Sequence, residues 1–235
     1  MPRRLLLVSN STAFGEGYLD HCLDEMLDFL GPVRRLTFVP FALYDRAGYG
    51  GKARERFAAA GCEVDVLTAD TAGRELIESA AAVFVGGGNT FRLLKTLQDS
   101  GLLEPLRTRA RAGMPYMGAS AGSNLAGPTV RTTNDMPIVE PASLDALGLV
   151  PFQINPHYLD PDPGSRHMGE PREQRLNEYL EENDRVVVGV REGTWIRVED
   201  DEGRLGGTTG ARIFRRGAEP EERPPGASVT DLLRR

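Results

Sequence analysis

Short apolar runs alternate with amphipathic segments along the first half of the chain. An apolar run of this length is typical of a buried strand, whereas apolar residues three and four positions apart are typical of a helix. The predicted strands are residues 5–9, 36–40, 62–67 and 81–85, and the predicted helices are residues 18–30, 51–60, 71–80, 90–98 and 103–112. This alternation predicts a three-layer α/β/α fold, in which helices cover both faces of a mostly parallel sheet.

The last third of the chain has a different pattern. Short apolar runs separated by polar turns follow one another there, at residues 185–190, 195–198, 204–205 and 211–214. Such spacing predicts an antiparallel C-terminal extension at a sheet edge. Residues 216–227 are rich in Gly, Pro and Glu, so we expect a loose surface tail from about residue 216. We interpret residues 1–235 as a single domain.

Composition and charge narrow the class of protein. The chain has 235 residues, a net charge of −6 and no long basic cluster, so a nucleic acid partner is not expected. The absence of a membrane-spanning apolar run and of a signal-peptide pattern predicts a cytoplasmic protein that does not bind a membrane. Cys22 and Cys62 are too few for a disulfide framework, and the cysteines and histidines lack metal-ligand spacing. We therefore expect no metal and no cofactor.

The most informative motif is Gly118-Ala119-Ser120-Ala121-Gly122, between the apolar run at 114–117 and a small-residue segment. A Gly-x-Ser-x-Gly sequence between a strand and a helix is typical of a nucleophile elbow, which exposes the serine hydroxyl above the sheet. Ser120 is therefore the candidate nucleophile. The backbone N–H of Ala121, at the start of the predicted helix, is a candidate donor to an oxyanion.

A second oxyanion donor is expected from the glycine-rich loop Gly86-Gly87-Gly88, which follows the strand at 81–85. Three glycines at a strand end can also bind phosphate, but the Gly-Lys-Ser/Thr of a P-loop and the Gly-x-Gly-x-x-Gly spacing are both absent. A glycine-rich loop beside a nucleophile is typical of the oxyanion holes of lipases and esterases, and Gly88 is the candidate donor.

Among the three histidines, His157 is the candidate general base. It follows an apolar run and the pair Asn155-Pro156, which is expected to end a strand. His157 would then lie at the sheet edge where ligands bind in α/β proteins. His21 is expected on a helix as a surface or packing residue, and His167 lies in a polar loop where a solvated side chain is expected.

Four segments together resemble the peptidase E family, the cytoplasmic aspartyl dipeptidases among the serine peptidases. The segments are residues 86–91, 118–122, 131–139 and 154–157, and the resemblance extends over nearly the whole chain. It implies a fold similar to class I glutamine amidotransferases, with serine in place of their cysteine nucleophile. It also implies that small peptides, namely dipeptides with an N-terminal aspartate, are hydrolysed through an acyl-enzyme without a metal.

Two carboxylates are candidates for the third member of a catalytic triad. Glu192 directly follows the strand predicted near 186–190, which places it at the same end of the sheet as His157. Asp135 lies in the segment 131–139 and matches the motif of the family that the chain resembles. We expect Glu192 to orient His157, with Asp135 supporting the site or sharing the relay.

The resemblance also suggests residues that select the aspartyl side chain. Arg172 matches the arginine of the family's Gly-Glu-Thr-Arg segment and can pair with a carboxylate in bidentate fashion, although Pro171 replaces the threonine. Asn89 and Thr90, beside the glycine-rich loop, are candidates for further hydrogen bonds to the substrate. Glu170 is the candidate acceptor for the free amino group of the dipeptide.

Three other interpretations remain open. A cyanophycinase-like enzyme, which cleaves β-aspartyl linkages, resembles this chain around the nucleophile. An amidotransferase-like glutaminase is disfavoured, because the elbow has no cysteine and Tyr158-Leu159 follow His157 in place of a His-x-Glu pair. A non-catalytic ligand-binding module on the same fold is the third, and the intact set of Ser120, His157 and acidic residues argues against it.

Overall fold

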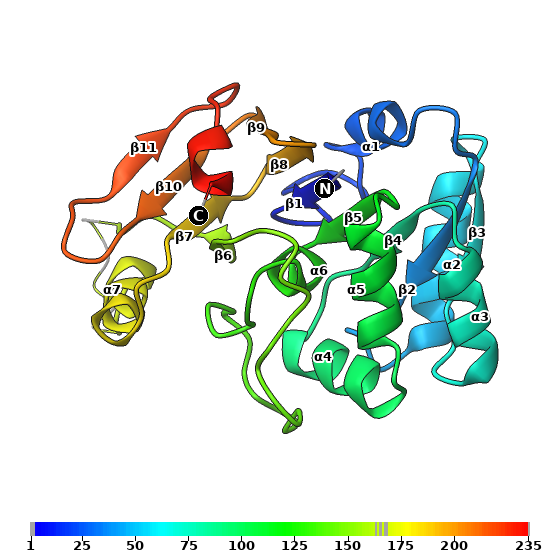
Figure 1. The fold of residues 1–235 in the computed structure, drawn as a ribbon. Coiled ribbons are helices and arrows are strands. Elements are labelled where there is room, and N and C mark those ends of the chain that lie inside the picture. Colours follow the sequence, from blue (N-terminus) through cyan, green and yellow to red (C-terminus); the bar gives the residue numbers. More distant parts are fainter. Residues whose placement is uncertain (1–2, 163, 165, 167–168, 235) are drawn as a thin grey trace.

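The structure is a computed structural model that describes residues 3–162, 164, 166 and 169–234. His167, for which a solvated loop position is predicted, lies outside the described residues. Within the described ranges the chain forms a large and a small β-sheet, with helices packed against both (Figure 1).

The larger sheet has seven strands in the order β3-β2-β4-β5-β1-β8-β9. The first five in this order pair in parallel, and the last two are antiparallel to their neighbours at one edge. The strands are β1 (Arg4–Val8), β2 (Arg35–Val39), β3 (Glu63–Val66), β4 (Val83–Val85), β5 (Tyr116–Ala119), β8 (Thr194–Glu199) and β9 (Glu202–Gly207). A mostly parallel sheet with an antiparallel edge confirms the α/β fold predicted from the sequence.

Helices cover both faces of the larger sheet, because successive residues of a strand point to opposite faces. Leu6 of β1 lies in the core beneath two helices, α1 (Leu23–Leu30) and α2 (Arg46–Ala58). Leu5 and Leu7 lie in the opposite core, beneath α3 (Thr71–Ser79), α4 (Thr90–Asp99), α5 (Leu103–Arg111) and α6 (Ala121–Leu125). In the part of the chain that the structure describes, no helix is long and apolar enough to cross a membrane.

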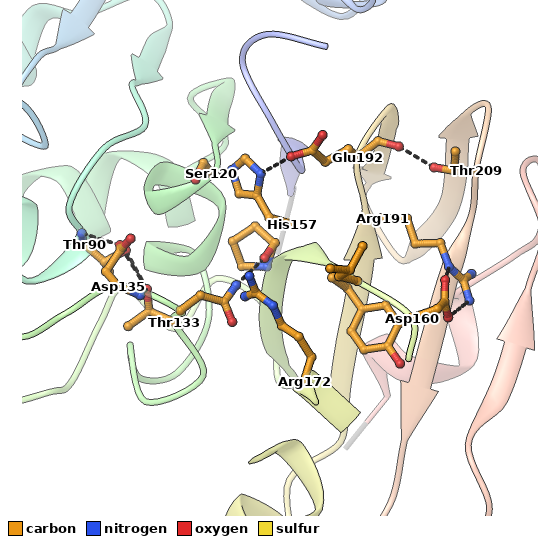
Figure 2. Close-up of a pocket in the computed structure, with 14 residues that line it drawn as sticks. Thr90, Ser120, Thr133, Asp135, His157, Asp160, Arg172, Arg191, Glu192 and Thr209 are labelled. Atoms are coloured by element: carbon orange, nitrogen blue, oxygen red, sulfur yellow. Dashed lines mark hydrogen bonds and ion pairs between the residues drawn. The ribbon is translucent and has the colours of Figure 1, made fainter. Parts of the chain in front are cut away.

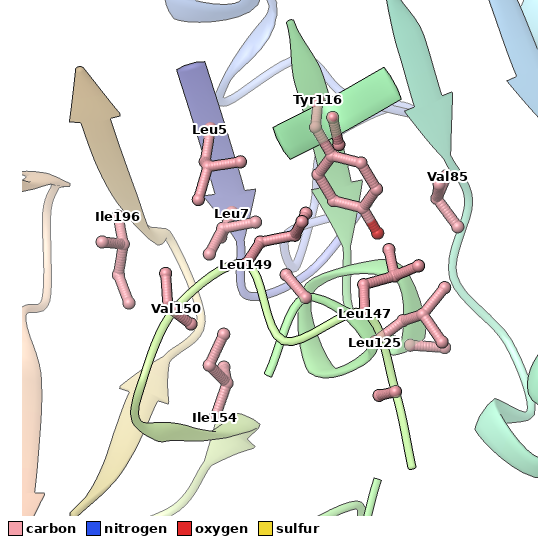
Figure 3. Packing of buried hydrophobic residues seen from close by; sticks show 14 of the residues in the cluster. Leu5, Leu7, Val85, Tyr116, Leu125, Leu147, Leu149, Val150, Ile154 and Ile196 are labelled. Atoms are coloured by element: carbon pink, nitrogen blue, oxygen red, sulfur yellow. The ribbon is translucent and has the colours of Figure 1, made fainter. Parts of the chain in front are cut away.

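The smaller sheet has the order β11-β10-β7-β6 and lies beside the larger one (Figure 1). Its strands are β6 (Gln153–Tyr158), β7 (Val187–Arg191), β10 (Ala211–Phe214) and β11 (Glu221–Arg223). Ile154 of β6 joins the same apolar core as Leu5 and Leu7 of β1, so one core connects the two sheets (Figure 3). The sequence patterns predict β7, β8, β9 and β10, but neither β11 nor the grouping of four strands into a second sheet.

Helix α7 (Arg172–Glu182) covers the outer face of the smaller sheet, and the sequence analysis does not predict it. Leu176 and Leu180 of this helix are buried against Val187 and Phe214. The spacing of these two leucines, one helical turn apart, is the signal that could have found the helix.

The segment expected to be a loose tail is folded. Strand β11 pairs with β10, and a short 3-10 helix, η1 (Thr230–Leu233), follows it. Leu232 and Leu233 are only 7% and 5% exposed and belong to the main core. The Gly and Pro residues that favour a loose segment instead form the turns between these elements, so composition alone is misleading here.

The first predicted helix is also shorter than expected. It was predicted from residue 18, but α1 begins at Leu23, and Leu19 has a left-handed backbone with φ of 63°. His21 therefore lies in a turn, not on a helix. Neither of its ring nitrogens has a hydrogen-bond partner among the described residues, and burial lowers the pKa of its imidazole.

Candidate active site

A pocket of about 640 Å³ lies where the carboxyl ends of strands from both sheets meet. Ser120 follows β5 of the larger sheet, whereas His157 lies in β6 and Glu192 follows β7 of the smaller one. All three side chains line the pocket (Figure 2), together with Thr90, Thr133, Asn134, Asp135, Pro156, Tyr158, Leu159, Asp160, Arg172, Arg191 and Thr209. The volume is in the range of sites for small ligands.

Ser120 occupies a sharp turn between β5 and α6. Its backbone has φ of 50° and ψ of −109°, a conformation that non-glycine residues rarely adopt. The flanking positions must be glycine, because neighbouring backbone atoms leave no room for a side chain. A Cβ on Gly118 would lie 2.5 Å from the carbonyl oxygen of Gly122. A Cβ on Gly122 would lie 2.2 Å from the carbonyl oxygen of Val85. The predicted strand–turn–helix geometry of a nucleophile elbow is therefore present.

Buried hydrogen bonds hold this elbow in place. The Ser123 hydroxyl lies 2.7 Å from the carbonyl oxygen of Val8 and 2.8 Å from that of Gly118. The hydroxyl of Tyr116 donates to the carbonyl of Gly122 at 2.6 Å. Because these contacts lie in the core, they fix the first turn of α6 and with it the position of Ser120.

His157 lies within strand β6, not beyond its end as the sequence analysis expects. The pairing of β6 with β7 shifts register between Pro156 and Tyr158, and His157 has φ of 54°. A bulge of this kind redirects a side chain, and Pro156 is tolerated because β6 is an edge strand. The N–H of His157 donates to the hydroxyl of Ser9 at 2.9 Å.

The imidazole of His157 lies between Ser120 and Glu192 (Figure 2). Its Nε2 is 2.9 Å from the Oγ of Ser120, and its Nδ1 is 2.6 Å from the Oε1 of Glu192. Because an ionised carboxylate only accepts hydrogen bonds, Nδ1 carries the proton and Nε2 accepts from the serine hydroxyl. This is the arrangement of a nucleophile, a general base and an orienting carboxylate.

Two residues, Thr209 and Asn10, hold Glu192 in this position, and neither was named individually in the sequence analysis. The hydroxyl of Thr209 donates to the backbone carbonyl of Glu192 at 2.5 Å, and Asn10 accepts from the N–H of Gly193 at 2.8 Å. Asn10 is fully buried at the end of β1, and polar residues just after a parallel strand are a usable sequence signal.

Asp135 lies in the same pocket but is not hydrogen-bonded to His157. Its Oδ2 accepts hydrogen bonds from the N–H of Thr90 at 2.8 Å, the Thr90 hydroxyl at 2.6 Å and the Thr133 hydroxyl at 3.0 Å. Thr90 is the first residue of α4, so this carboxylate lies at the positive end of a helix. The structure thus brings Glu192, and not Asp135, against His157.

Three of the predicted substrate contacts have other partners or positions. The side chain of Asn89 caps α4 by accepting from the N–H of Arg92 at 3.0 Å, and it donates to the carbonyl of Met136 at 2.8 Å. Thr90 is fully buried with its hydroxyl on Asp135. Glu170 is exposed, lies 3.8 Å from Arg175 and does not line the pocket.

Arg172, the first residue of α7, extends into the pocket (Figure 2). Its Nη1 is buried and has no hydrogen-bond partner among the described residues. Burial lowers the pKa of this guanidinium, and Arg175 lowers it further, while the charges of Asp135 and Glu192 oppose the change. A buried donor without a partner is costly, so this group is suited to bind an anionic ligand group.

The backbone donors predicted for an oxyanion hole lie near the nucleophile. Ala121 is the first residue of α6 and directly follows Ser120. The glycine-rich loop passes close to Ser120, because a Cβ on Gly87 would lie 3.1 Å from the Cβ of Ser120. The N–H groups of Gly88 and Ala121 donate no hydrogen bond to any other described residue.

In the described ranges, no group of three or more His, Cys, Asp and Glu side chains is arranged to hold a metal ion. The hydrogen bonds that join Ser120, His157 and Glu192 support nucleophilic catalysis by the serine hydroxyl.

Comparisons with known proteins agree with this geometry. Residues 5–206 match the model of peptidase family S51. A peptidase E of Streptomyces coelicolor is 57% identical over 97% of this chain and 94% of its own length. A Drosophila melanogaster protein named a probable alpha-aspartyl dipeptidase is 43% identical over 99% of this chain and 98% of its own.

Solved structures share the fold at much lower sequence identity. A peptidase from an acI-B1 actinobacterium superposes with a TM-score of 0.74 at 19% identity, over 97% of each chain. A Listeria monocytogenes protein superposes with a TM-score of 0.68 at 22% identity, over 89% of this chain and 100% of that one. The chain belongs to peptidase family S51, as the resemblance of its motifs predicts.

Proposed function

We propose that this chain is a serine-type dipeptidase that hydrolyses dipeptides with an N-terminal aspartate through an acyl-enzyme. The observation that supports it most is the continuous hydrogen-bonded line from Ser120 through His157 to Glu192, facing a pocket lined by Arg172, whose buried Nη1 has no hydrogen-bond partner among the described residues. The names of the relatives, peptidase E and alpha-aspartyl dipeptidase, support the same substrate class.

The first half of the reaction is acylation. The Oγ of Ser120 attacks the carbonyl carbon of the peptide bond while Nε2 of His157 takes the hydroxyl proton. The carbonyl oxygen becomes an oxyanion, which the N–H groups of Gly88 and Ala121 stabilise by about 3 kcal/mol each. The C–N bond then breaks as His157 returns the proton to the leaving amine, and the aspartyl group stays as an ester on Ser120.

The second half is hydrolysis of that ester. A water molecule takes the place of the leaving amine, and His157 removes its proton as it attacks the ester carbon. Collapse of the second tetrahedral intermediate expels the Ser120 oxygen, which recovers the proton from His157. Glu192 stabilises the imidazolium that forms in both halves and keeps the ring in the required tautomer.

Selectivity for aspartate is assigned to Arg172. A β-carboxylate in the pocket needs a fixed positive partner, and the planar guanidinium can bind both of its oxygens. The neutral side chain of Asn-X would leave the guanidinium without that partner. The resemblance to cytoplasmic aspartyl dipeptidases further supports a cytoplasmic location as part of the proposal.

The test is a dipeptide panel of Asp-Leu, Asn-Leu and β-Asp-Leu, assayed with the wild type and with Ser120→Ala. The proposal expects hydrolysis of Asp-Leu well above the other two, and a loss of roughly three to six orders of magnitude in Ser120→Ala because covalent catalysis is lost. Wild-type protein should also be labelled at Ser120 by a serine-reactive phosphonate. Preference for β-Asp-Leu would favour the cyanophycinase-like alternative, and failure of both hydrolysis and labelling would favour a binding module.

A further inference from the structure

We propose that Asp135 binds the α-ammonium group of the substrate and so restricts hydrolysis to the peptide bond of the N-terminal residue. This inference rests on the proposed Asp-X activity. It gives Asp135 a role in recognition, in place of a share in the proton relay, and it gives the amino group an acceptor other than Glu170.

The chemistry of the substrate requires such an acceptor. In an Asp-X dipeptide, the ammonium group is on the Cα next to the scissile carbonyl carbon. When that carbon reaches Ser120, the ammonium group is necessarily inside the same pocket. A charged group that leaves water needs a partner of opposite charge, so a carboxylate near Ser120 is expected.

Among the described residues that line the pocket, three have carboxylates: Asp135, Asp160 and Glu192. Asp160 is occupied, because the guanidinium of Arg191 binds its Oδ1 at 2.7 Å and its Oδ2 at 2.6 Å. Glu192 is occupied by His157, whose Nδ1 lies 2.6 Å from its Oε1. An ammonium group on Asp160 would have to displace the guanidinium of Arg191, and one on Glu192 would compete with the imidazole of His157 for the same negative charge.

Asp135 differs because none of the three groups that donate to it is a charged or ionisable side chain, and because its contacts are one-sided. All three of its side-chain hydrogen bonds, from the backbone and hydroxyl of Thr90 and the hydroxyl of Thr133, go to Oδ2. Its Oδ1 accepts no hydrogen bond from another described residue, and Asp135 is half-buried. The carboxylate is therefore held in place through one oxygen, while the other is available to a ligand.

Asp135 and Arg172 form a matched pair of opposite charges for the substrate. Asp135 and Arg172 line the same pocket, and the charge of Asp135 opposes the lowering of the pKa of the Arg172 guanidinium. Figure 2 shows them coming from different elements, Asp135 from the loop after α6 and Arg172 from the start of α7. An N-terminal aspartate has an ammonium group and a β-carboxylate, which complement these two charges.

Equilibrium binding to the Ser120→Ala protein tests the inference without turnover. Two ligands are compared by calorimetry: Asp-Leu, and succinyl-leucine, which keeps the β-carboxylate and the amide but lacks the amino group. We expect Asp-Leu to bind at least about tenfold more tightly, as one charged hydrogen bond provides. In Ser120→Ala/Asp135→Asn, the affinities should differ by less than about threefold, mainly because Asp-Leu binding weakens.

The matched control is Ser120→Ala/Thr133→Val, which removes one hydrogen bond to Asp135 but keeps the carboxylate, and which should retain the preference for Asp-Leu. Equal weakening of both ligands by Asp135→Asn would mean that Asp135 only supports the loop, and would overturn the inference. An equal affinity for both ligands in Ser120→Ala would overturn it as well. If wild-type protein leaves Asp-Leu intact, the proposed function itself fails, which is a different result.

Discussion

The carboxylate of Glu192 lies 2.6 Å from Nδ1 of His157, although the Glu192 side chain is 55% exposed. Solvent at this position screens the charge, so the carboxylate stabilises the imidazolium less than a fully buried one would. The position of Glu192 is nevertheless well fixed, because Thr209 and Asn10 form hydrogen bonds to the backbone of the turn that contains it. Orientation of the imidazole is then the main contribution of Glu192.

Replacing Glu192 with Gln should therefore lower kcat by roughly ten- to a thousandfold, less than the loss of about four orders known for a buried orienting carboxylate. The amide of Gln can donate to Nδ1 and favour the wrong tautomer, in which Nε2 carries the proton. Steady-state kinetics on Asp-Leu checks this, with KM expected to stay nearly constant. An unchanged kcat in Glu192→Gln would contradict the orienting role of this carboxylate.

Removing the Arg172 guanidinium should abolish the preference for an aspartyl side chain. Arg172→Ala is expected to cost roughly 2–4 kcal/mol in kcat/KM for Asp-Leu, as for one buried charge pair, while Asn-Leu changes little. Arg175→Ala is the control, because Arg175 lies on the same helix but is largely exposed outside the pocket. An unchanged ratio of Asp-Leu to Asn-Leu in Arg172→Ala would assign selectivity to other residues.

The C-terminal segment should contribute measurably to stability. Leu233 is 5% exposed within the main core, so Leu233→Ala should lower the free energy of unfolding by roughly 2–3 kcal/mol. Urea denaturation measures this, and Ile138→Ala serves as a control, because Ile138 is 51% exposed. A change below about 0.5 kcal/mol in Leu233→Ala, the size usual for surface positions, would contradict this packing.

The thiol of Cys22 should be unreactive in the folded protein. Burial raises its pKa to about 12, so at pH 8 almost none of it is the nucleophilic thiolate. Raising the pH from 7 to 9 should therefore leave the labelling rate of Cys22 by a thiol reagent very low. Labelling in Cys62→Ser, with and without urea, isolates this thiol, and rapid reaction in the native state would contradict the prediction.

The positions in the site that could be predicted from the sequence are those that directly follow a strand. Ser120 and Glu192 directly follow strands, which is where ligand-binding residues are expected in α/β proteins, although the two strands belong to different sheets. The position of His157 within β6 could not be predicted, because a bulge depends on pairing with β7. The attachment of Asp135 to Thr90 likewise depends on contacts between residues 45 positions apart.

The fold, like the site, could be predicted only in part from the sequence. Apolar runs and helical spacing predict a mostly parallel sheet with helices on both faces and an antiparallel edge, since each element buries a face that its own sequence encodes. The smaller sheet was missed because β6 and β7 are separated by a long segment and pair only in the folded chain. The folded end at Leu232 and Leu233 was missed because two leucines give no periodic signal.

The buried hydroxyl of Ser9 has a consequence for the order in which activity and secondary structure are lost on heating. Ser9 follows β1 of the larger sheet, yet its Oγ donates to the carbonyl of Val190 at 2.8 Å and accepts from the N–H of His157. Ser120, the proposed nucleophile, and His157, its proposed base, thus belong to different sheets that the Ser9 hydroxyl helps to join. The rate of catalysis should therefore depend on how well the larger and the smaller sheet stay packed against each other. On gentle heating, turnover should decline before the circular dichroism of either sheet does, with Ser9→Ala separating the two events further.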